Sequence, residues 1–352
     1  MKRIAGIVAI VVVAVVVAYL WLRPKAQLYP EAYIGDRTAT VWSSLAQVRQ
    51  QVATLHFGQK VEVVAHRGDQ AQIRLASGVL GWLDGRELMD AVLWQQSMKL
   101  LGDTRKMPLQ ARGVTKVPTN VRAQPGRNAA RVFQFGREVP VEIFARAAVA
   151  WAPSPEETAA RESSAEEQKA RREDWLLVRG RASAMGNPVA PGEGGAGAAN
   201  VQEETVDVAG WVLARFIALT LPDAIKDYAS SSGMHVLAWF ELNRVPEQPG
   251  SQTEKPQYLV AGTRGGEEQP CDFSMIRVYT WGAARQRYET AYVEGQLCGY
   301  LPIRVARASS GEPEFRFQAL EESGKEELVY RMKQTIVRRV RESGEAPRRR
   351  RR

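Results

Sequence analysis

A pattern of aromatic residues, glycine and valine occurs twice in this 352-residue chain. The two copies are Phe57-Gly58-x-x-Val61-x-Val63 and Phe135-Gly136-x-x-Val139-x-Val141, and downstream of each stands a Gly-Trp pair, Gly81-Trp82 and Gly210-Trp211. Short runs of alternating apolar residues separated by glycines are typical of small antiparallel β modules. Because the offsets recur, the sequence predicts that one small β module is built twice.

The second copy carries further residues of a known module. It opens with Thr119-Asn-Val-Arg-Ala-Gln-Pro-Gly126 and continues with Phe135-Gly136, Trp175-Leu-Leu-Val178 and Gly210-Trp211-Val212. Together these segments resemble the bacterial SH3 domain over residues 116–219. Residues 38–90 resemble it less closely, because Trp42 replaces the arginine that follows the valine and Gln70 stands where the second copy has Trp175. The resemblance implies two small SH3-like β-barrels in tandem.

The segments around these modules differ in composition. Residues 91–115 form a connector, in which Leu93, Trp94 and Leu101 predict a short amphipathic helix. Inside the second module, residues near 152–174 are charged and rich in alanine, and residues near 180–206 are rich in glycine, alanine and proline. We expect both to be disordered insertions at hairpin positions, where loops lengthen at little cost.

Residues 233–342 form a third domain with a strand-rich pattern. Alternation of apolar and polar residues, clearest around Met275 to Tyr279, predicts an antiparallel sheet. Near its end, Leu328, Met332, Ile336 and Val340 are spaced by four, which predicts a terminal basic helix that docks on the sheet or lies on a membrane surface. The predicted fold class is therefore mainly β, with an N-terminal transmembrane helix, two small SH3-like β-barrels, and a C-terminal antiparallel β domain with a terminal basic helix.

An apolar run extends from Ile4 to Leu22 and is long enough to cross a bilayer as a helix. We interpret residues 1–25 as an uncleaved membrane anchor; the alternative is a cleaved signal peptide, although no small-x-small cleavage pattern precedes Arg23. Because bacterial SH3 domains mostly work in the cell envelope, the resemblance implies a single-pass membrane protein. Its N-terminus would be cytoplasmic and the bulk of the chain periplasmic or extracytoplasmic.

The chain ends in an arginine-rich tail, residues 343–352, which contributes to the net charge of +9. Such a run is typical of a solvated, disordered tail, and less often of an anchor for anionic lipid or a polyanionic polymer. No aromatic residue is interleaved with it, so we do not expect nucleic acid as a partner.

The inventory of reactive side chains is small, with three histidines and two cysteines. Neither a Cys-x-x-Cys pair nor a His-x-x-x-His pair occurs, so we expect no metal site, no cofactor and no catalytic residues. In an oxidising compartment, Cys271 and Cys298 would form a disulfide; the alternative is two buried thiols. Carboxylates such as Glu241, Asp272, Glu289 and Glu294 leave a hidden carboxylate enzyme site open as a further alternative.

The predicted function is binding rather than catalysis. The resemblance implies that the SH3-like modules bind peptidoglycan or peptide segments, with Trp42 and Trp175 as candidate ligand-binding residues. The expected partners are a cell-wall polymer or envelope proteins, and the membrane through the N-terminal helix. The alternatives are a protein–protein scaffold subunit of an envelope complex, and an enzyme with a carboxylate site in the C-terminal domain.

Overall fold

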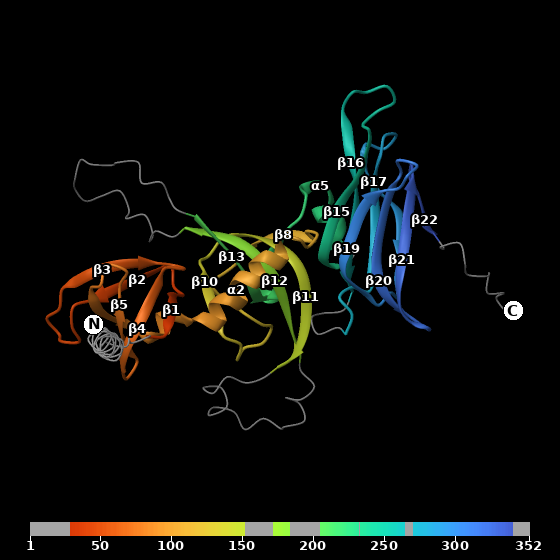
Figure 1. The fold of residues 1–352 in the computed structure, drawn as a ribbon. Helices are drawn as coiled ribbons and strands as arrows, with labels where there is room; N and C mark the ends of the chain where they lie inside the picture. The colour runs from red at the N-terminus through yellow and green to blue at the C-terminus, as the bar shows by residue number, and fades with distance from the viewer. Residues whose placement is uncertain (1–28, 152–171, 184–204, 232, 265–269, 341–352) are drawn as a thin grey trace, which may run out of the picture.

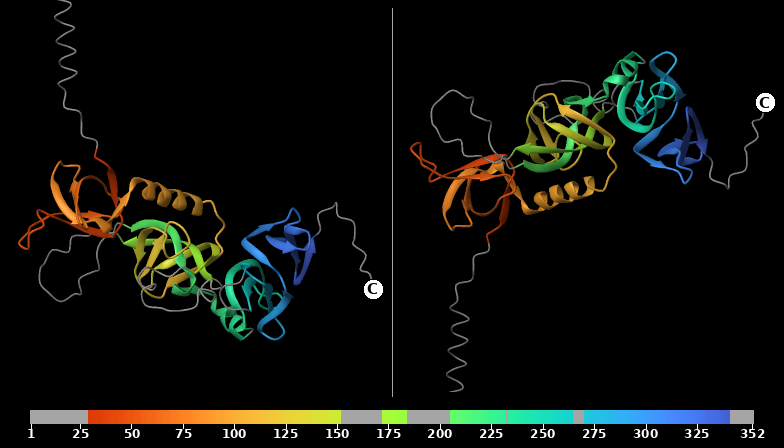
Figure 2. Two further views of the ribbon diagram at one scale, coloured as in Figure 1. Left: turned by 90° about the horizontal axis from the view of Figure 1, so that it is seen from below. Right: turned by 90° about the horizontal axis from the view of Figure 1, so that it is seen from above.

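The computed structural model describes residues 29–151, 172–183, 205–231, 233–264 and 270–340. They form three bodies in a row, with the second β module in the middle (Figures 1 and 2). The predicted anchor (1–25) and arginine tail (343–352), and most of the two predicted insertions, lie outside the described residues. Among the helices that are described, none combines the length and hydropathy needed to cross a bilayer.

The first module is a seven-stranded antiparallel sheet with the strand order β3-β2-β6-β5-β4-β1-β7. Its core contains small and branched apolar residues that alternate inward, among them Val41, Val61 and Ile73. A short 3-10 helix, η1 (Gly85–Glu87), joins the last two strands. The strands are β1 (Glu31–Ile34), β2 (Thr38–Trp42), β3 (Gln51–His56), β4 (Lys60–Arg67), β5 (Gln70–Arg74), β6 (Leu80–Asp84) and β7 (Leu88–Asp90).

The second module repeats this topology strand by strand, in the order β10-β9-β13-β12-β11-β8-β14. A 3-10 helix, η2 (Ala214–Phe216), again precedes the last strand. The predicted duplication is therefore confirmed in the strand order. The strands are β8 (Ala111–Thr115), β9 (Thr119–Arg122), β10 (Arg131–Phe135), β11 (Pro140–Ala150), β12 (Arg172–Ser183), β13 (Thr205–Leu213) and β14 (Ile217–Thr220).

Several predicted details of the modules are wrong. The sheets of the two predicted small barrels are not closed, because β3 and β7 are the edges of one and β10 and β14 the edges of the other. Each module also begins earlier than its motif, since β1 and β8 pair with β4 and β11. The predicted insertions are shorter, because residues 172–174 and 180–183 belong to β12 and residues 205–206 to β13.

The repeated Gly-Trp pair marks the place where two strands cross closely. Only one residue pair joins the crossing strands in each module, Trp42 with Trp82 and Trp211 with Arg122. A Cβ atom on Gly81 would lie 2.3 Å from Val41 Cγ1, and one on Gly210 would lie 2.6 Å from Val121 Cγ1. Glycine is required at both positions because no side chain fits between the strands.

The connector forms the helix α2 (Ala91–Thr104), as predicted. Its N-terminus is capped by Asp90, whose Oδ1 accepts a hydrogen bond of 2.7 Å from Leu93 N. Trp94 of this helix stacks on Tyr33 of the first module, with ring centroids 4.8 Å apart. Phe57 then meets Phe133 of the second module edge-on at 4.9 Å, so aromatic contacts join the two modules directly.

The third body begins with α5 (Asp223–Ser231) and contains two four-stranded antiparallel sheets. A shared apolar core lies between the sheets, so this body is a β-sandwich, as Figure 1 shows. The first sheet comprises β15 (His235–Pro246), β16 (Glu254–Thr263), β17 (Met275–Gly282) and β18 (Arg287–Glu294), and the second β19 (Gly299–Arg307), β20 (Pro313–Glu321), β21 (Gly324–Lys333) and β22 (Ile336–Val340).

The predicted terminal basic helix is wrong, because residues 324–340 form the hairpin β21–β22. A spacing of four is also a multiple of the two-residue period of a strand, so Leu328 and Met332 face one side of a strand equally well. Tyr330 lies between them on that side, and all three are buried in the sandwich. The turn places Gln334 at a φ of 56°, and Ile336 remains 55% exposed.

Candidate functional site

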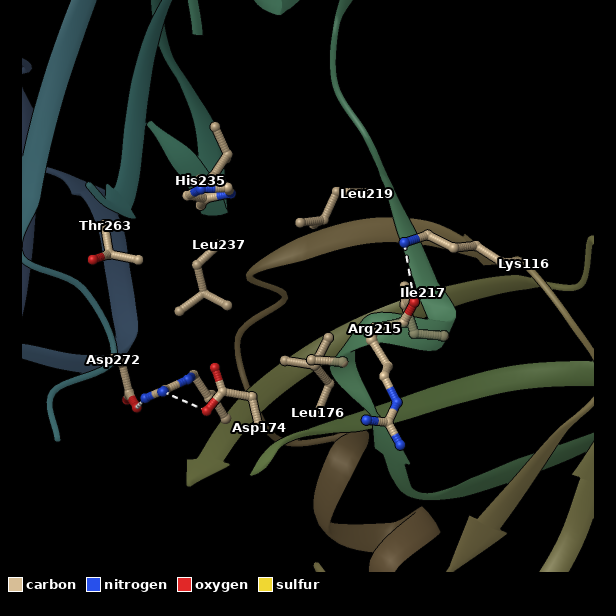
Figure 3. Close-up of a pocket in the computed structure, with 13 residues that line it drawn as sticks. Lys116, Asp174, Leu176, Arg215, Ile217, Leu219, His235, Leu237, Thr263 and Asp272 are labelled. Carbon is tan, nitrogen blue, oxygen red and sulfur yellow. Dashed lines mark hydrogen bonds and ion pairs between the residues drawn. The ribbon is translucent and has the colours of Figure 1, made fainter. Parts of the chain in front are cut away.

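A cavity of about 420 Å³ lies between the second module and the third domain (Figure 3). The start of β12, the helix η2 and β14 form one wall, and the start of β15, the end of β16 and the loop before β17 form the other. Its apolar lining consists of Leu176, Ala214, Ile217, Leu219, Val236 and Leu237. Its polar lining consists of Lys116, Arg146, Asp174, Arg215, His235, Thr263 and Asp272. The cavity therefore combines an apolar surface with charges of both signs.

One side of the cavity is closed by a buried ionic cluster centred on Arg146 of β11. This side chain is 4% exposed, and its Nη2 lies 2.6 Å from Asp174 Oδ1. Its Nη1 lies 3.2 Å from Oδ1 of Asp272, which belongs to the third domain. The second oxygen of Asp272 accepts a 2.8 Å hydrogen bond from Leu301 N. The pKa of Asp272 is raised, because burial outweighs the stabilisation that Leu301 and Arg146 give its charged form.

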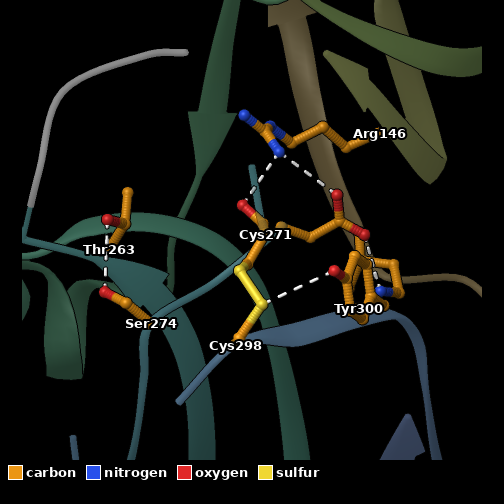
Figure 4. Close-up of a disulfide and its surroundings, with 8 residues drawn as sticks. Arg146, Thr263, Cys271, Ser274, Cys298 and Tyr300 are labelled. Atoms are coloured by element: carbon orange, nitrogen blue, oxygen red, sulfur yellow. Dashed lines mark hydrogen bonds and ion pairs between the residues drawn. A yellow bond between two sulfur atoms is a disulfide. The ribbon is translucent and has the colours of Figure 1, made fainter. Parts of the chain in front are cut away.

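The disulfide between Cys271 and Cys298 adjoins this cluster (Figure 4). The carbonyl oxygen of Cys271 accepts a 3.0 Å hydrogen bond from Arg146 Nη1. The sequence prediction of a Cys271–Cys298 disulfide is confirmed. The bond ties the loop that carries Asp272 to the start of β19, and it thereby fixes the carboxylate that Arg146 contacts.

A second connection between the same two bodies is a fully buried amide. Gln110 Oε1 accepts a 2.8 Å hydrogen bond from Ile303 N, and Gln110 Nε2 donates to Ile303 O at 3.1 Å. The backbone oxygen of Gln110 accepts from Trp239 N at 3.1 Å. Paired hydrogen bonds of this kind define one docking geometry, because each unmade bond would leave a buried polar group unsatisfied.

The two tryptophans predicted to bind ligand lie in different modules. Trp42 is half-buried at the end of β2, with the Arg49 guanidinium 4.4 Å from the centre of its ring. Trp175 is 1% exposed in β12, and its Nε1 is buried with no hydrogen-bond partner in the described structure. Trp175 is thus buried in the second module, where it also lines a small pocket together with Arg122 and Arg215. The structure does not bring the two tryptophans together.

The residues that sequence reasoning missed are Arg146, Asp174 and Gln110. Arg146 stands among apolar residues in the second half of β11, and a charge in such a run was the only signal that the sequence offered. Asp272 was named as one carboxylate among several, but nothing in the sequence indicates its pairing with Arg146.

The cluster offers little that fits acid–base or nucleophilic chemistry. Asp174 and Asp272 both bind the Arg146 guanidinium, and both cysteine sulfurs are used in the disulfide. His235 lies on the rim of the cavity and is exposed. Within the described ranges, no group of three or more histidine, cysteine, aspartate or glutamate side chains could hold a metal ion. The arrangement is suited to holding a small amphipathic ligand.

Comparisons with known proteins give no family for this chain. No family model matches it, and no curated protein matches it. Among solved structures, NlpC2 from Trichomonas vaginalis has 8% identity and a TM-score of 0.17, covering 86% of this chain and 93% of its own. An NlpC/P60 family protein from Bacillus cereus has 10% identity and a TM-score of 0.20, covering 89% and 95%. Similarity at these TM-scores does not establish a common fold.

Proposed function

We propose that this chain is a non-catalytic binding protein of the bacterial cell envelope. In this proposal the SH3-like second module and the third domain together bind a short peptide segment. The observation that carries it is the cavity between the two bodies, with an apolar wall formed by Leu176, Ile217 and Leu237. Pockets that bind small ligands are concave, mostly apolar, and contain a few convergent polar groups.

The polar rim supports a peptide as the ligand. Lys116 Nζ donates a 3.0 Å hydrogen bond to Arg215 O, which places one ammonium group at the mouth of the cavity. His235 and Thr263 lie across from it on the third domain (Figure 3). A peptide offers apolar side chains to the wall and backbone acceptors and donors to such a rim. The peptide would belong to peptidoglycan or to a partner protein.

The location and the anchor are part of the same proposal. The apolar segment Ile4 to Leu22 would hold the chain in the membrane, and the three bodies would lie on the extracytoplasmic side. Two SH3-like modules on one anchor would raise the local concentration of weak binding sites near a wall polymer. The disulfide supports this compartment, because disulfides persist mainly in oxidising environments.

The test uses full-length protein in mild detergent, mixed with purified bacterial cell wall and sedimented. We expect the protein to pellet with the wall, and Leu237→Arg, which places a charge in the cavity, to remain in the supernatant. His235→Glu is a second variant, for the case that Leu237→Arg does not fold. It changes an exposed residue on the rim of the cavity and should also reduce pelleting. Ile336→Arg is the matched control, because Ile336 is 55% exposed on β22. Equal pelleting of all four proteins would reject the cavity as the site.

A second candidate function is a scaffold subunit in an envelope complex. The observation that favours it is that the three bodies are joined by direct contacts, through Phe57–Phe133 and Gln110–Ile303, and form one extended particle. Cross-linking in membranes followed by mass spectrometry separates the two functions. Protein cross-links at cavity residues without any wall retention would favour the scaffold.

A further inference from the structure

A second pocket, of about 280 Å³, lies on the second module and is lined by three arginines. Arg122 comes from the end of β9, Arg127 from the loop that follows it, and Arg215 from η2. Three positive charges converging on a small pocket are costly to assemble without negative charges nearby.

Two of the three arginines contact the same carboxylate. One buried carboxylate, Glu173, receives a bidentate contact from Arg127, with the closest atoms 2.7 Å apart. The same carboxylate lies 3.5 Å from Arg215, which is 38% exposed. Two guanidinium groups thus share one carboxylate. Figure 3 shows that the Arg215 guanidinium points away from Asp174 and Asp272 of the neighbouring cavity.

Arg122 has no carboxylate partner among the described residues. Its Nη1 donates a hydrogen bond to the carbonyl oxygen of Ala129. Its pKa is lowered, first by burial and then by the positive charges of Arg131 and Arg127. Arg122 therefore brings to the pocket a positive charge that no described carboxylate pairs with, and an anion would stabilise it.

In the first module, the arginine at the same position has a carboxylate partner of its own. By the spacing from the repeated tryptophans, Arg86 corresponds to Arg215 and Asp84 to Leu213. Asp84 binds the Arg86 guanidinium through both carboxylate oxygens, at 3.0 Å and 3.2 Å from Nε. Trp42 also stands where the second module has Arg122. Among the described residues, an arginine at the position of Arg122, without a carboxylate partner, occurs in the second module and not in the first.

We infer that this arginine pocket binds the terminal carboxylate of a peptide. A guanidinium fork matches a planar carboxylate with two parallel hydrogen bonds. The remaining lining combines two polar residues with four apolar ones, which suit the side chain of the residue that carries the carboxylate: Thr119, Asn120, Pro118, Trp175, Leu213 and Phe216. The small volume limits the site to about the last one or two residues of a peptide. This inference rests on the proposed peptide-binding function and adds an anchor point for the end of the chain.

The test is calorimetric titration of the full-length protein with acetyl-Ala-Ala that has a free carboxylate, and with its C-terminal amide. We expect the acid to bind at least about tenfold more tightly than the amide, because charge-assisted hydrogen bonds to guanidinium groups are lost in the amide. Arg122→Gln should remove this difference, and Arg215→Gln should reduce it. Arg86→Gln, which loses the same charge in the first module, should leave it unchanged. The D- and L-isomers of the dipeptide distinguish a wall stem from a protein C-terminus.

Several outcomes would overturn the inference. Equal binding of acid and amide would show that the carboxylate is not recognised. If Arg122→Gln and Arg86→Gln reduce the affinity for the acid by the same factor, the effect would come from the net charge of the protein and not from this pocket. Competition by inorganic phosphate at the same concentration as the dipeptide would indicate a general anion site. If the Arg122→Gln variant sediments with the cell wall as wild type does, and the dipeptide does not bind wild type, the arginine pocket is rejected and the proposed function stands. If wild type neither sediments with the wall nor binds the dipeptide, the pocket and the proposed function are both rejected.

Discussion

Arg146 and Asp272 lie on different bodies of the protein, and their side chains meet at 3.2 Å between Nη1 and Oδ1. Removing one partner of a buried ion pair leaves an uncompensated charge, which typically costs about 3–5 kcal/mol. We therefore expect Arg146→Met to destabilise the second module and the third domain by this amount in urea unfolding. Arg181→Met is the control, because Arg181 is 78% exposed in its pair with Asp207, and it should cost less than about 1 kcal/mol. If Arg146→Met and Arg181→Met lowered the free energy of unfolding equally, the Arg146–Asp272 ion pair would not hold the two bodies together.

The disulfide should stabilise the third domain. The two cysteines are 27 residues apart, and the chain-entropy model gives about 3.5 kcal/mol for closing a loop of that length. The double variant Cys271→Ser/Cys298→Ser should unfold at lower temperature by calorimetry. Adding a reductant should lower the unfolding temperature of the wild type but not of this variant. If the reductant lowers the unfolding temperature of the variant as much as that of the wild type, the reductant acts on something other than this disulfide.

Trp175 should behave as a core residue with one unfavourable polar atom. Its Nε1 is buried and has no acceptor in the described structure. Because an unsatisfied buried donor is costly, Trp175→Phe loses volume but also removes that cost, so it should change stability little. Trp175→Ala should cost about 3–5 kcal/mol through the cavity that it leaves. The measurement is thermal unfolding of both variants, and a large loss in Trp175→Phe would contradict the expectation.

The duplicated modules were predictable because their signal is local. The repeated Gly-Trp pair lies at a tight strand crossing in each module, and the two sheets share one strand order. The Cys271–Cys298 bond was predictable from the presence of two cysteines and the expected compartment. The hairpin of β21 and β22 was not, because Leu328 and Met332 satisfy both a helical spacing and a strand spacing.

The sites depend on contacts that the sequence does not encode locally. Arg146 and Asp272 are separated by 126 residues, and Gln110 and Ile303 by 193. Each pair becomes visible only once the second module and the third domain are docked. The arginine pocket is similar, because Arg122, Arg127 and Arg215 come from three segments of the chain. Trp175 was named from the sequence as a candidate ligand-binding residue, and it is buried beside this pocket.

The contact between the first two modules should depend on pH through Glu87. Its pKa is raised to about 7, mainly by burial, then by the negative charges of Asp36 and Asp84, while Arg131 of the second module acts in the opposite direction. The folded state therefore holds a proton more tightly than the unfolded state, and stability falls as pH rises from about 4.5 to about 7. Glu87→Gln should raise the unfolding temperature of these modules above pH 7 and have no effect below about pH 4.5. Scanning calorimetry between pH 4 and 9 measures this, with Glu138→Gln as the control, because the Glu138 side chain is 77% exposed. A stability difference that is the same at every pH would exclude Glu87 as the titrating group.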